Sequence, residues 1–454
     1  MSVIIGASPA CALPGTPLAH AAAGLDACVH CGFCLQACPT YVNLEDENDS
    51  PRGRLVLMRR LLEGDVALDD ADVGRHFDRC LGCRACETAC PSGVPYGALL
   101  EATRATMAPV RGIPWVARIV LAVFTRTTML RVALFLARRF RDTGLPRWLA
   151  RVLPDRFAFP MAMLASTSPV RLPSAVEHLP SAVERLPSAF ERLPSPVSRL
   201  PSSDAAVAER SVTCLTGCVM HGLFGHVNAA TRRVLTHNGF TLVDTANQHC
   251  CGALHAHAGD LRGARELAKR NIVAFEASGT GAIAINSAGC GAMVKQYGHL
   301  LHDDAQWTAR ADAVAARAHD VSELLALVGP REGAPLPLRV AHDPPCHQMH
   351  AQRVVQQPLA VFAAIPGLNL VPLEDADQCC GSAGIYNLVE PDTSNAVLAP
   401  KLARIATTNA SLIATGNPGC MMQIGAGLLR NGSTMRVVHP VELLDASYGG
   451  NAPR

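Results

Sequence analysis

The stretch Cys28-Val-His-Cys-Gly-Phe-Cys-Leu-Gln-Ala-Cys-Pro39 decides how the first part of this 454-residue chain folds. It recurs as Cys80-Leu-Gly-Cys-Arg-Ala-Cys-Glu-Thr-Ala-Cys-Pro91, with the same intervals between cysteines. This is the C-x2-C-x2-C-x3-C-P spacing of two-cluster bacterial ferredoxins. Three thiolates at every third residue surround one cube, and the fourth, followed by proline, turns toward the other cube. The repeat therefore predicts two adjacent 4Fe-4S clusters.

By this rule each cluster takes three cysteines from one copy and one from the other. The first ferredoxin set is Cys28, Cys31, Cys34 and Cys90, and the second ferredoxin set is Cys80, Cys83, Cys86 and Cys38. A pair of structural zinc sites would need only two cysteine pairs for each metal, so it leaves the longer run unexplained. Two neighbouring clusters indicate a path for single electrons.

The segment between the two motifs has the signals of a helix. Ser50 is a good cap, Pro51 suits the first turn, and Gly64 is a good stop. The apolar residues between them fall on one face: Leu55, Met58, Leu61 and Leu62. We therefore expect a mostly helical cluster domain rather than a small β-hairpin ferredoxin.

Residues 211–454 contain an internal duplication built around Cys-Cys-Gly. Short apolar segments at 282–286, 338–342 and 411–415 alternate with helical stretches, which is typical of parallel α/β units. Ligands gather at the carboxyl edge of such sheets, so each half should bring four thiols together just after its strands. The first Cys-Cys-Gly set is Cys218, Cys250, Cys251 and Cys290, and the second Cys-Cys-Gly set is Cys346, Cys379, Cys380 and Cys420.

The occupant of these two sets stays open between a further iron-sulfur cluster, a structural metal such as zinc, a redox-active disulfide and nothing. Adjacent cysteines are poor disulfide partners for each other, but both can reach a multinuclear cluster. Cys214 is a candidate fifth ligand in the first half only. Histidines near these cysteines are expected to donate hydrogen bonds rather than bind metal: His221, His249, His255, His257 and His347.

No catalytic residue is assigned, because the chain has no phosphate loop, Gly-x-Ser-x-Gly or His-Glu-x-x-His motif. It shows no flavin or nicotinamide site of its own. A net charge of +2 and 4% aromatic residues argue against nucleic acid as a partner. No apolar run reaches the length of a membrane span, and the first 25 residues lack the basic start of a signal peptide. We expect a cytoplasmic protein with free thiols.

The expected fold class is α+β and multidomain. A helical two-cluster domain precedes duplicated α/β Cys-Cys-Gly domains with short parallel sheets. The expected boundaries are a flexible arm at 1–20, the ferredoxin-type domain at 21–110, a basic helical segment at 111–170, a linker at 171–205, and the two halves at 206–335 and 336–454. The linker repeats Leu-Pro-Ser every seven residues, preceded by Arg or, once, by His178, and its prolines exclude a continuous coiled coil.

The basic segment has an unusual charge balance. Between residues 104 and 171 there are twelve arginines and two acids. Arginine alternates with apolar residues at helical spacing, which suits amphipathic helices on an anionic membrane surface or against an acidic partner. A solvated hairpin packed on its own domain is the alternative.

Further motifs carry a resemblance to a known family: Ser50-Pro-Arg-Gly-Arg54, Asn286-Ser-Ala-Gly-Cys-Gly-Ala-Met293 and Cys379-Cys-Gly-Ser-Ala-Gly-Ile-Tyr386. Together with the ferredoxin motifs, they resemble the iron-sulfur subunits of bacterial glycolate oxidase (glycolate dehydrogenase). The resemblance implies a cytosolic, membrane-associated complex. In it, FAD-binding partner subunits oxidise glycolate, and this subunit passes electrons onward to quinone.

Related Cys-Cys-Gly proteins include lactate-utilisation subunits, a membrane-anchor subunit of anaerobic glycerol-3-phosphate dehydrogenase and heterodisulfide reductase. They give the alternative function, a subunit whose Cys-Cys-Gly centre is itself catalytic. In the reductase the last cysteine lies in a C-x-x-C motif. In this chain the second cysteine of that motif is replaced by Met293 after Cys290 and by Gln423 after Cys420. The five-thiol cluster of that enzyme is therefore not expected.

Overall fold

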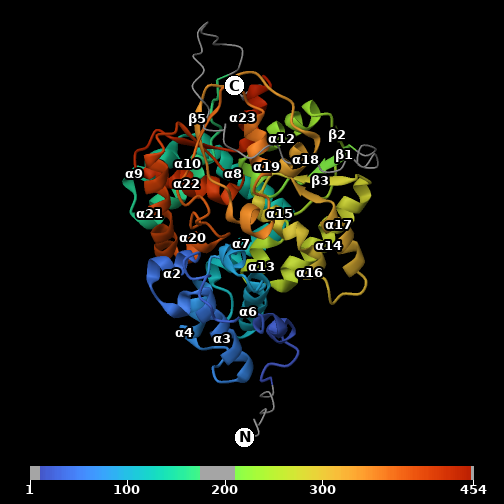
Figure 1. The fold of residues 1–454 in the computed structure, drawn as a ribbon, viewed down its shortest axis with the longest axis vertical. Helices are drawn as coiled ribbons and strands as arrows, with labels where there is room; N and C mark the ends of the chain where they lie inside the picture. The colour runs from blue at the N-terminus through green and yellow to red at the C-terminus, as the bar shows by residue number, and fades with distance from the viewer. Residues whose placement is uncertain (1–10, 174–209, 451–454) are drawn as a thin grey trace. The chain divides into compact units, whose positions relative to one another are not determined.

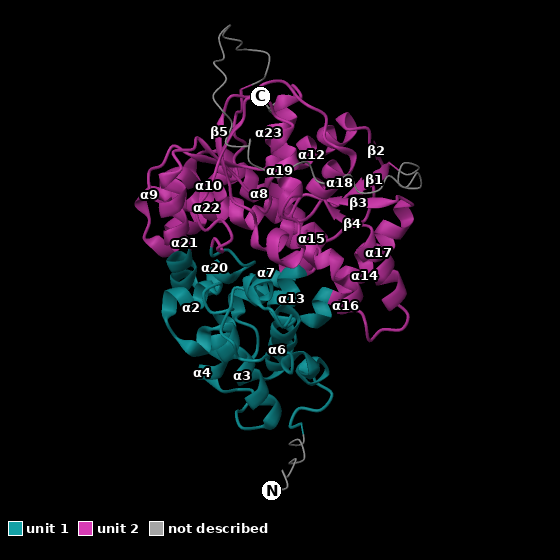
Figure 2. Ribbon diagram, viewed as in Figure 1, with its two compact units in different colours: residues 1–122, 253–264, 381–397 teal, residues 123–252, 265–380, 398–454 magenta. Residues whose placement is uncertain are grey.

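The structure, a computed structural model, describes residues 11–173 and 210–450 (Figure 1). The chain divides into two compact units (Figure 2). Unit 1 is made of the chain up to residue 122 together with residues 253–264 and 381–397, and unit 2 of residues 123–252, 265–380 and 398 onward. Most of the expected linker, and residues 1–10 of the expected arm, lie outside the described residues.

All regular secondary structure in the described part of unit 1 is helical, as predicted for the cluster domain. It contains α1 (Pro17–Ala21), η1 (Ala22–Leu25), α2 (Pro39–Leu44), η2 (Glu47–Asp49), α3 (Pro51–Glu63), α4 (Ala71–Asp78), α5 (Ala85–Ala89), α6 (Tyr96–Arg111), most of α7 (Trp115–Thr125), α13 (Ala253–His257) and α20 (Tyr386–Val389). The expected boundaries placed residues 253–264 in the half at 206–335 and residues 381–397 in the half at 336–454, so they did not anticipate that these two segments belong to this unit.

Helix α3 forms between the signals that the sequence indicated. The side chain of Ser50 accepts a hydrogen bond from the backbone N–H of Gly53, and Pro51 occupies the first turn. Gly64 ends the helix with a φ of 79°, a left-handed conformation that glycine adopts at little cost. Leu55, Met58, Leu61 and Leu62 are all buried.

The end of the expected flexible arm differs from the prediction. Residues Pro17–Ala21 form α1, which Thr16 caps by accepting a hydrogen bond from Ala19 N–H. The side chain of Leu18 is fully buried, and its backbone N–H donates to Thr106 Oγ1 at 3.0 Å. This segment is part of the core of unit 1, because one leucine and one helix cap anchor it.

Unit 2 contains two four-stranded sheets in which every pair of neighbours is parallel, as the α/β pattern predicted. The first has the order β2-β1-β3-β4, with β1 (Ser211–Cys214), β2 (Thr241–Leu242), β3 (Ala282–Ile285) and β4 (Ala318–Asp320). The second has the order β6-β5-β7-β8, with β5 (Arg339–His342), β6 (Asn369–Val371), β7 (Leu412–Ala414) and β8 (Arg436–Val438).

The helices of unit 2 surround these sheets. They are α8 (Thr127–Asp142), α9 (Leu145–Val152), α10 (Asp155–Ser166), α11 (Val219–Leu223), α12 (Gly225–His237), most of α14 (Leu261–Ser278), α15 (Ala288–Lys295), α16 (Tyr297–Leu300), α17 (Thr308–Ala316), α18 (Val321–Val328), the π-helix η5 (His347–Ala351), α19 (Gln357–Ala363), part of α21 (Pro391–Thr407), α22 (Pro418–Arg430) and α23 (Pro440–Ser447).

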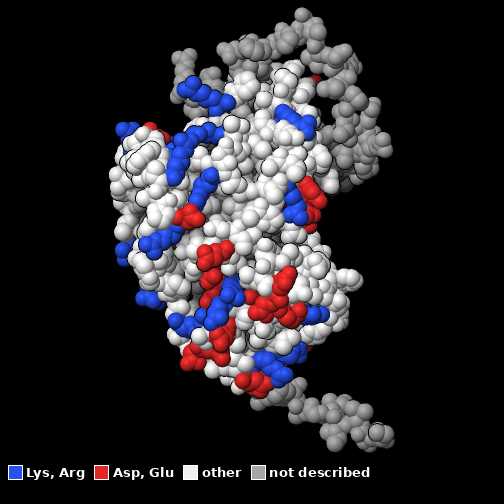
Figure 3. All heavy atoms as spheres, turned by 90° about the vertical axis from the view of Figure 1, so that its left-hand side faces the viewer, with Lys and Arg blue, Asp and Glu red and all other residues white. Residues whose placement is uncertain are grey.

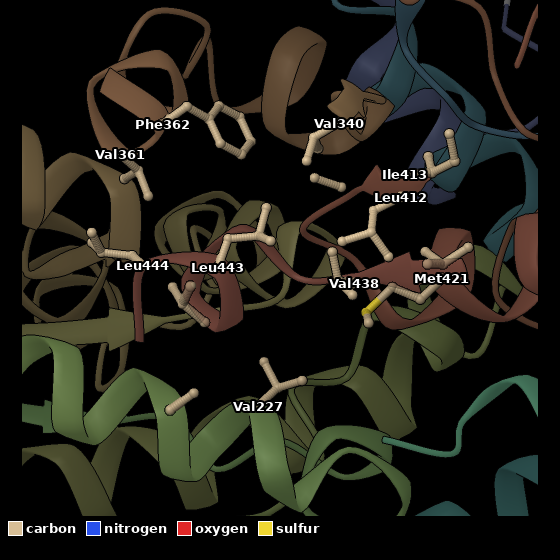
Figure 4. Packing of buried hydrophobic residues seen from close by; sticks show 14 of the residues in the cluster. Val227, Val340, Val361, Phe362, Leu412, Ile413, Met421, Val438, Leu443 and Leu444 are labelled. Carbon is tan, nitrogen blue, oxygen red and sulfur yellow. The ribbon is translucent and has the colours of Figure 1, made fainter. Parts of the chain in front are cut away.

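Residues of both halves share one hydrophobic core in unit 2 (Figure 4). Val340 and Ile413 come from the second sheet, Val227 from α12 of the first half, and Leu443 from α23. Equivalent backbone hydrogen bonds show which residues of the two halves correspond to each other. Leu215 N–H donates to Ala284 O, and Asp343 N–H donates to Ala414 O, both at 2.9 Å.

No described helix is both long and apolar enough to cross a membrane by itself. Within residues 11–173 and 210–450, only α6 and α7 taken together meet such a criterion, and these two helices meet at a bend of 112°.

Candidate metal centres

The first ferredoxin set lies around one hollow of unit 1. Cys28, Cys31, Cys34 and Cys90 all line it, together with Arg52 and residues near both motifs. Three of these cysteines come from a loop before α2, and Cys90 directly follows α5. The chain thus brings the fourth thiol from the other motif, which is the exchange that the ferredoxin spacing predicts.

The second ferredoxin set lies around a neighbouring hollow. Cys80, Cys83, Cys86 and Cys38 line it, with Arg54 among the other lining residues. Three residues line both hollows: Pro51, Cys86 and Tyr96. The four thiols of one set line each hollow, with Cys86 of the second set also reaching the first hollow, and thiolates are the usual ligands of a 4Fe-4S cluster. The donor sets therefore fit two neighbouring clusters, and Pro51, Cys86 and Tyr96 lie between the two hollows.

Left-handed backbone turns lie in both cysteine loops. His30 and Gly32 have φ values of 56° and 84°, and Gly82 and Arg84 have values of 62° and 64°. These conformations bend the chain tightly between successive cysteines. Each loop can therefore wrap around one hollow instead of extending as a strand.

A buried arginine stands beside the second ferredoxin set. The side chain of Arg54 is 0% exposed, and its guanidinium donates to Asp49 Oδ1 at 3.1 Å, Thr40 Oγ1 at 3.1 Å and His76 O at 2.6 Å. Burial lowers its pKa, but electrostatic interactions with Cys80, Tyr96, Cys38 and Asp49 outweigh this and raise it. Arg54 therefore stays charged next to thiolates that would otherwise repel one another.

Burial also affects the thiols themselves. It raises the pKa of Cys34 to about 11 and raises the pKa values of Cys38 and Cys86. A thiol in such surroundings stays protonated near neutral pH unless a cation binds it. The Thr40 hydroxyl lies 3.2 Å from Cys38 Sγ, and the Tyr96 hydroxyl lies 3.5 Å from Cys80 Sγ. Both can donate to a thiolate.

The first Cys-Cys-Gly set comes together in unit 2. The sulfur atoms of Cys218 and Cys250 are 3.7 Å apart. Contacts with Cys250 and burial raise the pKa of Cys218, and contacts with Cys250 and Cys290 raise that of Cys251. The pKa of Cys290 is lowered, because the Cys251 thiol donates to it. Cys250 and Cys251 are each 3% exposed, which disfavours direct attack on a disulfide substrate.

Contacts in the second Cys-Cys-Gly set join Cys346, Cys380 and Cys420. The contact with Cys380 raises the pKa of Cys420, and Cys346 adds to the effect. Cys379 is also buried, at 4% exposed. The amide of Asn417 lies 3.5 Å from Cys420 Sγ.

Two details differ from the sequence expectation. Cys290 and Cys420 do not follow their strands directly but lie in the first turns of α15 and α22. Cys214, the candidate fifth ligand, has other neighbours. Burial raises its pKa to about 11, while Arg232 and Asp244 are the charged groups that act on it.

Three of the five histidines lie within hydrogen-bond distance of a side-chain oxygen. His255 Nδ1 lies 2.7 Å from Asp260 Oδ2, His257 Nδ1 lies 3.0 Å from Glu101 Oε1, and His249 Nδ1 lies 2.9 Å from Thr127 Oγ1.

The charged partners of the thiols were not among the residues that the sequence motifs indicated. Lys401 and Asp343 form a buried pair of 3.0 Å whose lysine acts on Cys346 and Cys380. At the corresponding place in the first half, Asn271 donates to Cys250 O at 2.9 Å. The sequence signal for this pair was Lys401 itself, because a lysine on the otherwise apolar face of a helical segment is unusual without a buried partner. For Arg54 the signal was its place in the quoted Ser-Pro-Arg-Gly-Arg motif.

Comparisons with known proteins agree with this architecture. A 4Fe-4S dicluster domain matches residues 24–94, and a cysteine-rich domain matches residues 212–295 and again 340–425. The dicluster domain with its cysteine motifs implies two 4Fe-4S clusters.

Two similar proteins extend over nearly the whole chain. The probable glycolate oxidase iron-sulfur subunit of Bacillus subtilis (strain 168) is 36% identical over 438 residues, which cover 93% of this chain and 94% of that protein. The glycolate oxidase iron-sulfur subunit of Escherichia coli (strain K12) is 34% identical over 412 residues, 88% and 90% of the two chains. Lactate utilization protein A of Geobacillus kaustophilus (strain HTA426) is 30% identical over 237 residues, 52% of this chain and 98% of that protein. The chain belongs to the family of glycolate oxidase iron-sulfur subunits.

Proposed function

We propose that this chain is the electron-transfer subunit of a glycolate (2-hydroxy acid) dehydrogenase complex. It receives electrons from FAD-binding partner subunits and passes them to an acceptor, which we take to be a quinone. The observation that carries this proposal is the pair of hollows lined by the two ferredoxin sets, which share Cys86 and Tyr96. Clusters bound there supply one-electron transfer over a short gap.

The proposal places substrate oxidation in another chain. The sequence offers no flavin motif and no general base for removing a proton from a hydroxy acid. Purified by itself, the chain should contain iron and sulfide but should not oxidise glycolate. Turnover of glycolate by the isolated chain would refute the assignment.

Each ferredoxin ligand can be tested against a cysteine outside the motifs. Cys31→Ser removes a thiol of the first ferredoxin set, and Cys11→Ser removes an exposed thiol that has no assigned role. With anaerobic purification, the Cys31 variant should lose iron and one set of EPR signals, while the Cys11 variant should match the unaltered chain. Equal iron content in the two variants would contradict the ligand assignment.

We also propose that both Cys-Cys-Gly sets bind metal, with an iron-sulfur cluster as the leading occupant. Buried thiols at 3.7 Å, such as Cys218 and Cys250, gain most from sharing a cation. Iron and sulfide analysis separates the alternatives. About eight irons per chain correspond to the ferredoxin sets alone, and about sixteen would fill all four sets. Zinc without additional sulfide would indicate a structural metal, and loss of free thiols without metal would indicate a disulfide.

Finally, we propose that unit 2 contacts the membrane surface through helices α8, α9 and α10. Their exposed large apolar side chains are Met129, Val132, Phe135, Leu136, Leu145, Trp148, Val152 and Phe157. Exposed arginines lie among them: Arg126, Arg131, Arg138, Arg139, Arg147, Arg151 and Arg156. Figure 3 looks onto the side of unit 2 where α9 lies, and basic side chains there stand apart on a mostly uncharged surface.

This mixture suits an anionic bilayer. Apolar side chains enter the boundary between headgroups and acyl chains, and arginines meet lipid phosphates. The Arg156 guanidinium lies over the Phe157 ring at 4.7 Å from its centre, so the charge and the ring share one surface.

A further inference from the structure

Unit 1 contains a third hollow, beside the second ferredoxin set. It has a volume of about 100 Å³ and is walled by the loop after α4, by α6, by the start of α7, by α13 and by the segment around α20. Cys80 and Leu81 line this hollow and also line the hollow of the second ferredoxin set. A molecule held here would therefore be separated from that cluster site only by these two residues.

Hydrogen bonds hold the wall around Cys80 in place. The Arg104 guanidinium donates to the carbonyl oxygens of Phe77 at 2.7 Å, Cys80 at 2.6 Å and His257 at 2.9 Å. The Tyr386 hydroxyl donates to the carbonyl oxygen of Arg79 at 2.8 Å. Arg104 and Tyr386 both line the hollow. Two side chains distant in sequence thus fix the loop, so the hollow is a built feature of the unit.

The lining combines an apolar slot with a few polar groups. Met107, Ile113 and Leu254 are among its apolar residues. His257 also lines it, and its Nδ1 is 3.0 Å from the carboxylate of Glu101. Pockets of this composition orient flat organic molecules, because the apolar walls bind the ring and the polar groups bind its oxygen atoms.

The outer side of the hollow suits a lipid-soluble occupant. Ala117 of α7 lines the hollow and is 2% exposed. On the same helix, Trp115 and Ile119 are 72% and 56% exposed. These exposed side chains can make apolar contacts with an alkyl tail or with lipid. A polar electron acceptor would make no favourable contact with them.

We propose that this hollow binds the ring of a lipid-soluble quinone, with Cys80 and Leu81 on one side and His257 near a quinone oxygen. The inference rests on the proposed electron-transfer function and gives it a site for the acceptor. Reduction of one quinone to quinol takes two electrons, which the iron-sulfur centres supply one at a time, and two protons, one for each ring oxygen. The hydrogen-bonded pair of His257 and Glu101 offers a path by which the protons arrive from solvent.

The test fills the hollow without touching a cysteine. Ala117→Phe places a ring into the hollow from α7, and Ala258→Phe does so from the end of α13. Ala122→Phe makes the same change at an exposed position of α7 and serves as the control. Iron content and EPR spectra of the full chain should be the same in all three variants, which shows that the clusters and the fold are retained.

Binding is measured directly with an azido-benzoquinone that carries a short alkyl tail. After illumination, mass spectrometry should locate the label in peptides that line the hollow, and either filling variant should reduce labelling at least tenfold. The dithionite-reduced chain should likewise lose at least tenfold in the rate of quinone reduction in these variants, whereas reduction of ferricyanide, which needs no lipophilic pocket, should not change.

Labels found outside the hollow would overturn the inference, as would equal losses in the Ala122 control. In both cases the proposed function would stand, provided that the reduced chain still passes electrons to ferricyanide. A chain without iron and sulfide would instead remove the proposed function itself.

Discussion

Replacing Lys401 by methionine should strongly destabilise unit 2. The side chains of Lys401 and Asp343 are 1% and 3% exposed, and their charged atoms are 3.0 Å apart. Lys401 Nζ also donates to the carbonyl oxygens of Asp375 at 3.2 Å and Ala376 at 3.0 Å. The second oxygen of Asp343 accepts from Thr415 Oγ1 at 3.1 Å. Methionine keeps most of the lysine's apolar length, so the change mainly removes the charge and three hydrogen bonds.

The expected loss of unfolding free energy depends on whether Asp343 stays charged in the Lys401→Met variant. Removing one partner of a buried pair costs about 3–5 kcal/mol, because the other charge stays buried and unpaired. Asp343 can avoid that cost by binding a proton. Burial already raises its pKa above the ordinary value of 3.8. Protonation at pH 7 therefore costs less than about 4.5 kcal/mol, at roughly 1.4 kcal/mol per pKa unit. We expect the free energy of unfolding to fall by about 3–4 kcal/mol.

Urea unfolding of the full chain, followed by circular dichroism, measures the change. Lys269→Met is the matched control, because Lys269 pairs with Asp304 on a partly exposed surface where the two side chains are 29% and 30% exposed. Its cost should stay below about 1 kcal/mol. The double variant Asp343→Asn with Lys401→Met should recover about 2 kcal/mol relative to the sum of the single changes.

The duplication supplies a second test of the same reasoning. The equivalent backbone hydrogen bonds align Asp343 with Leu215 and Thr415 with Ile285, and Leu215 and Ile285 are 2% and 1% exposed. A variant that carries Asp343→Leu, Thr415→Ile and Lys401→Asn should therefore be more stable than Lys401→Met alone. Equal costs for Lys401→Met and Lys269→Met, or strictly additive single changes, would refute the account of a coupled buried pair.

Three further predictions concern charge and surface. Burial of His342 lowers its pKa from 6.5 to about 4, so the unfolded chain binds more protons than the folded chain between these pH values. The free energy of unfolding should therefore fall by up to about 3 kcal/mol from pH 6.5 to pH 4. His342→Phe should make that fall smaller, as measured by urea titrations at several pH values. Arg54→Gln removes a buried cation beside the second ferredoxin set, so the reduction potential of a cluster bound there should fall by on the order of 50–100 mV. Redox titration followed by EPR measures this potential, and an unchanged value would exclude the electrostatic role of Arg54. Trp148→Ala combined with Phe135→Ala should weaken sedimentation with anionic vesicles at least tenfold, whereas Leu327→Ala, an equally exposed apolar residue on α18, should leave it unchanged.

Local signals in the chain were sufficient for the elements and for the grouping of thiols. Ser50 and Gly64 bound α3 because a cap and a left-handed stop act within a few residues. The parallel strands were visible because buried strands form continuous apolar runs. The ferredoxin spacing indicated which cysteines exchange between the two motifs, since its thiols sit on short loops that leave the chain few alternatives.

Other features depend on contacts between residues far apart in sequence, and no local pattern encodes them. The segments after the two Cys-Cys-Gly motifs join the cluster unit. There the Tyr386 hydroxyl donates to the carbonyl oxygen of Arg79, next to Cys80, and the carbonyl oxygen of His257 accepts from Arg104 of α6. Lys401 and Asp343 pair only because α21 packs against the end of β5. Sequence by itself determined which atoms can bind metal, because ligand chemistry and short loops are local. Only the tertiary structure decided which charges and hollows surround those atoms, because burial and pairing exist only once distant segments have packed together.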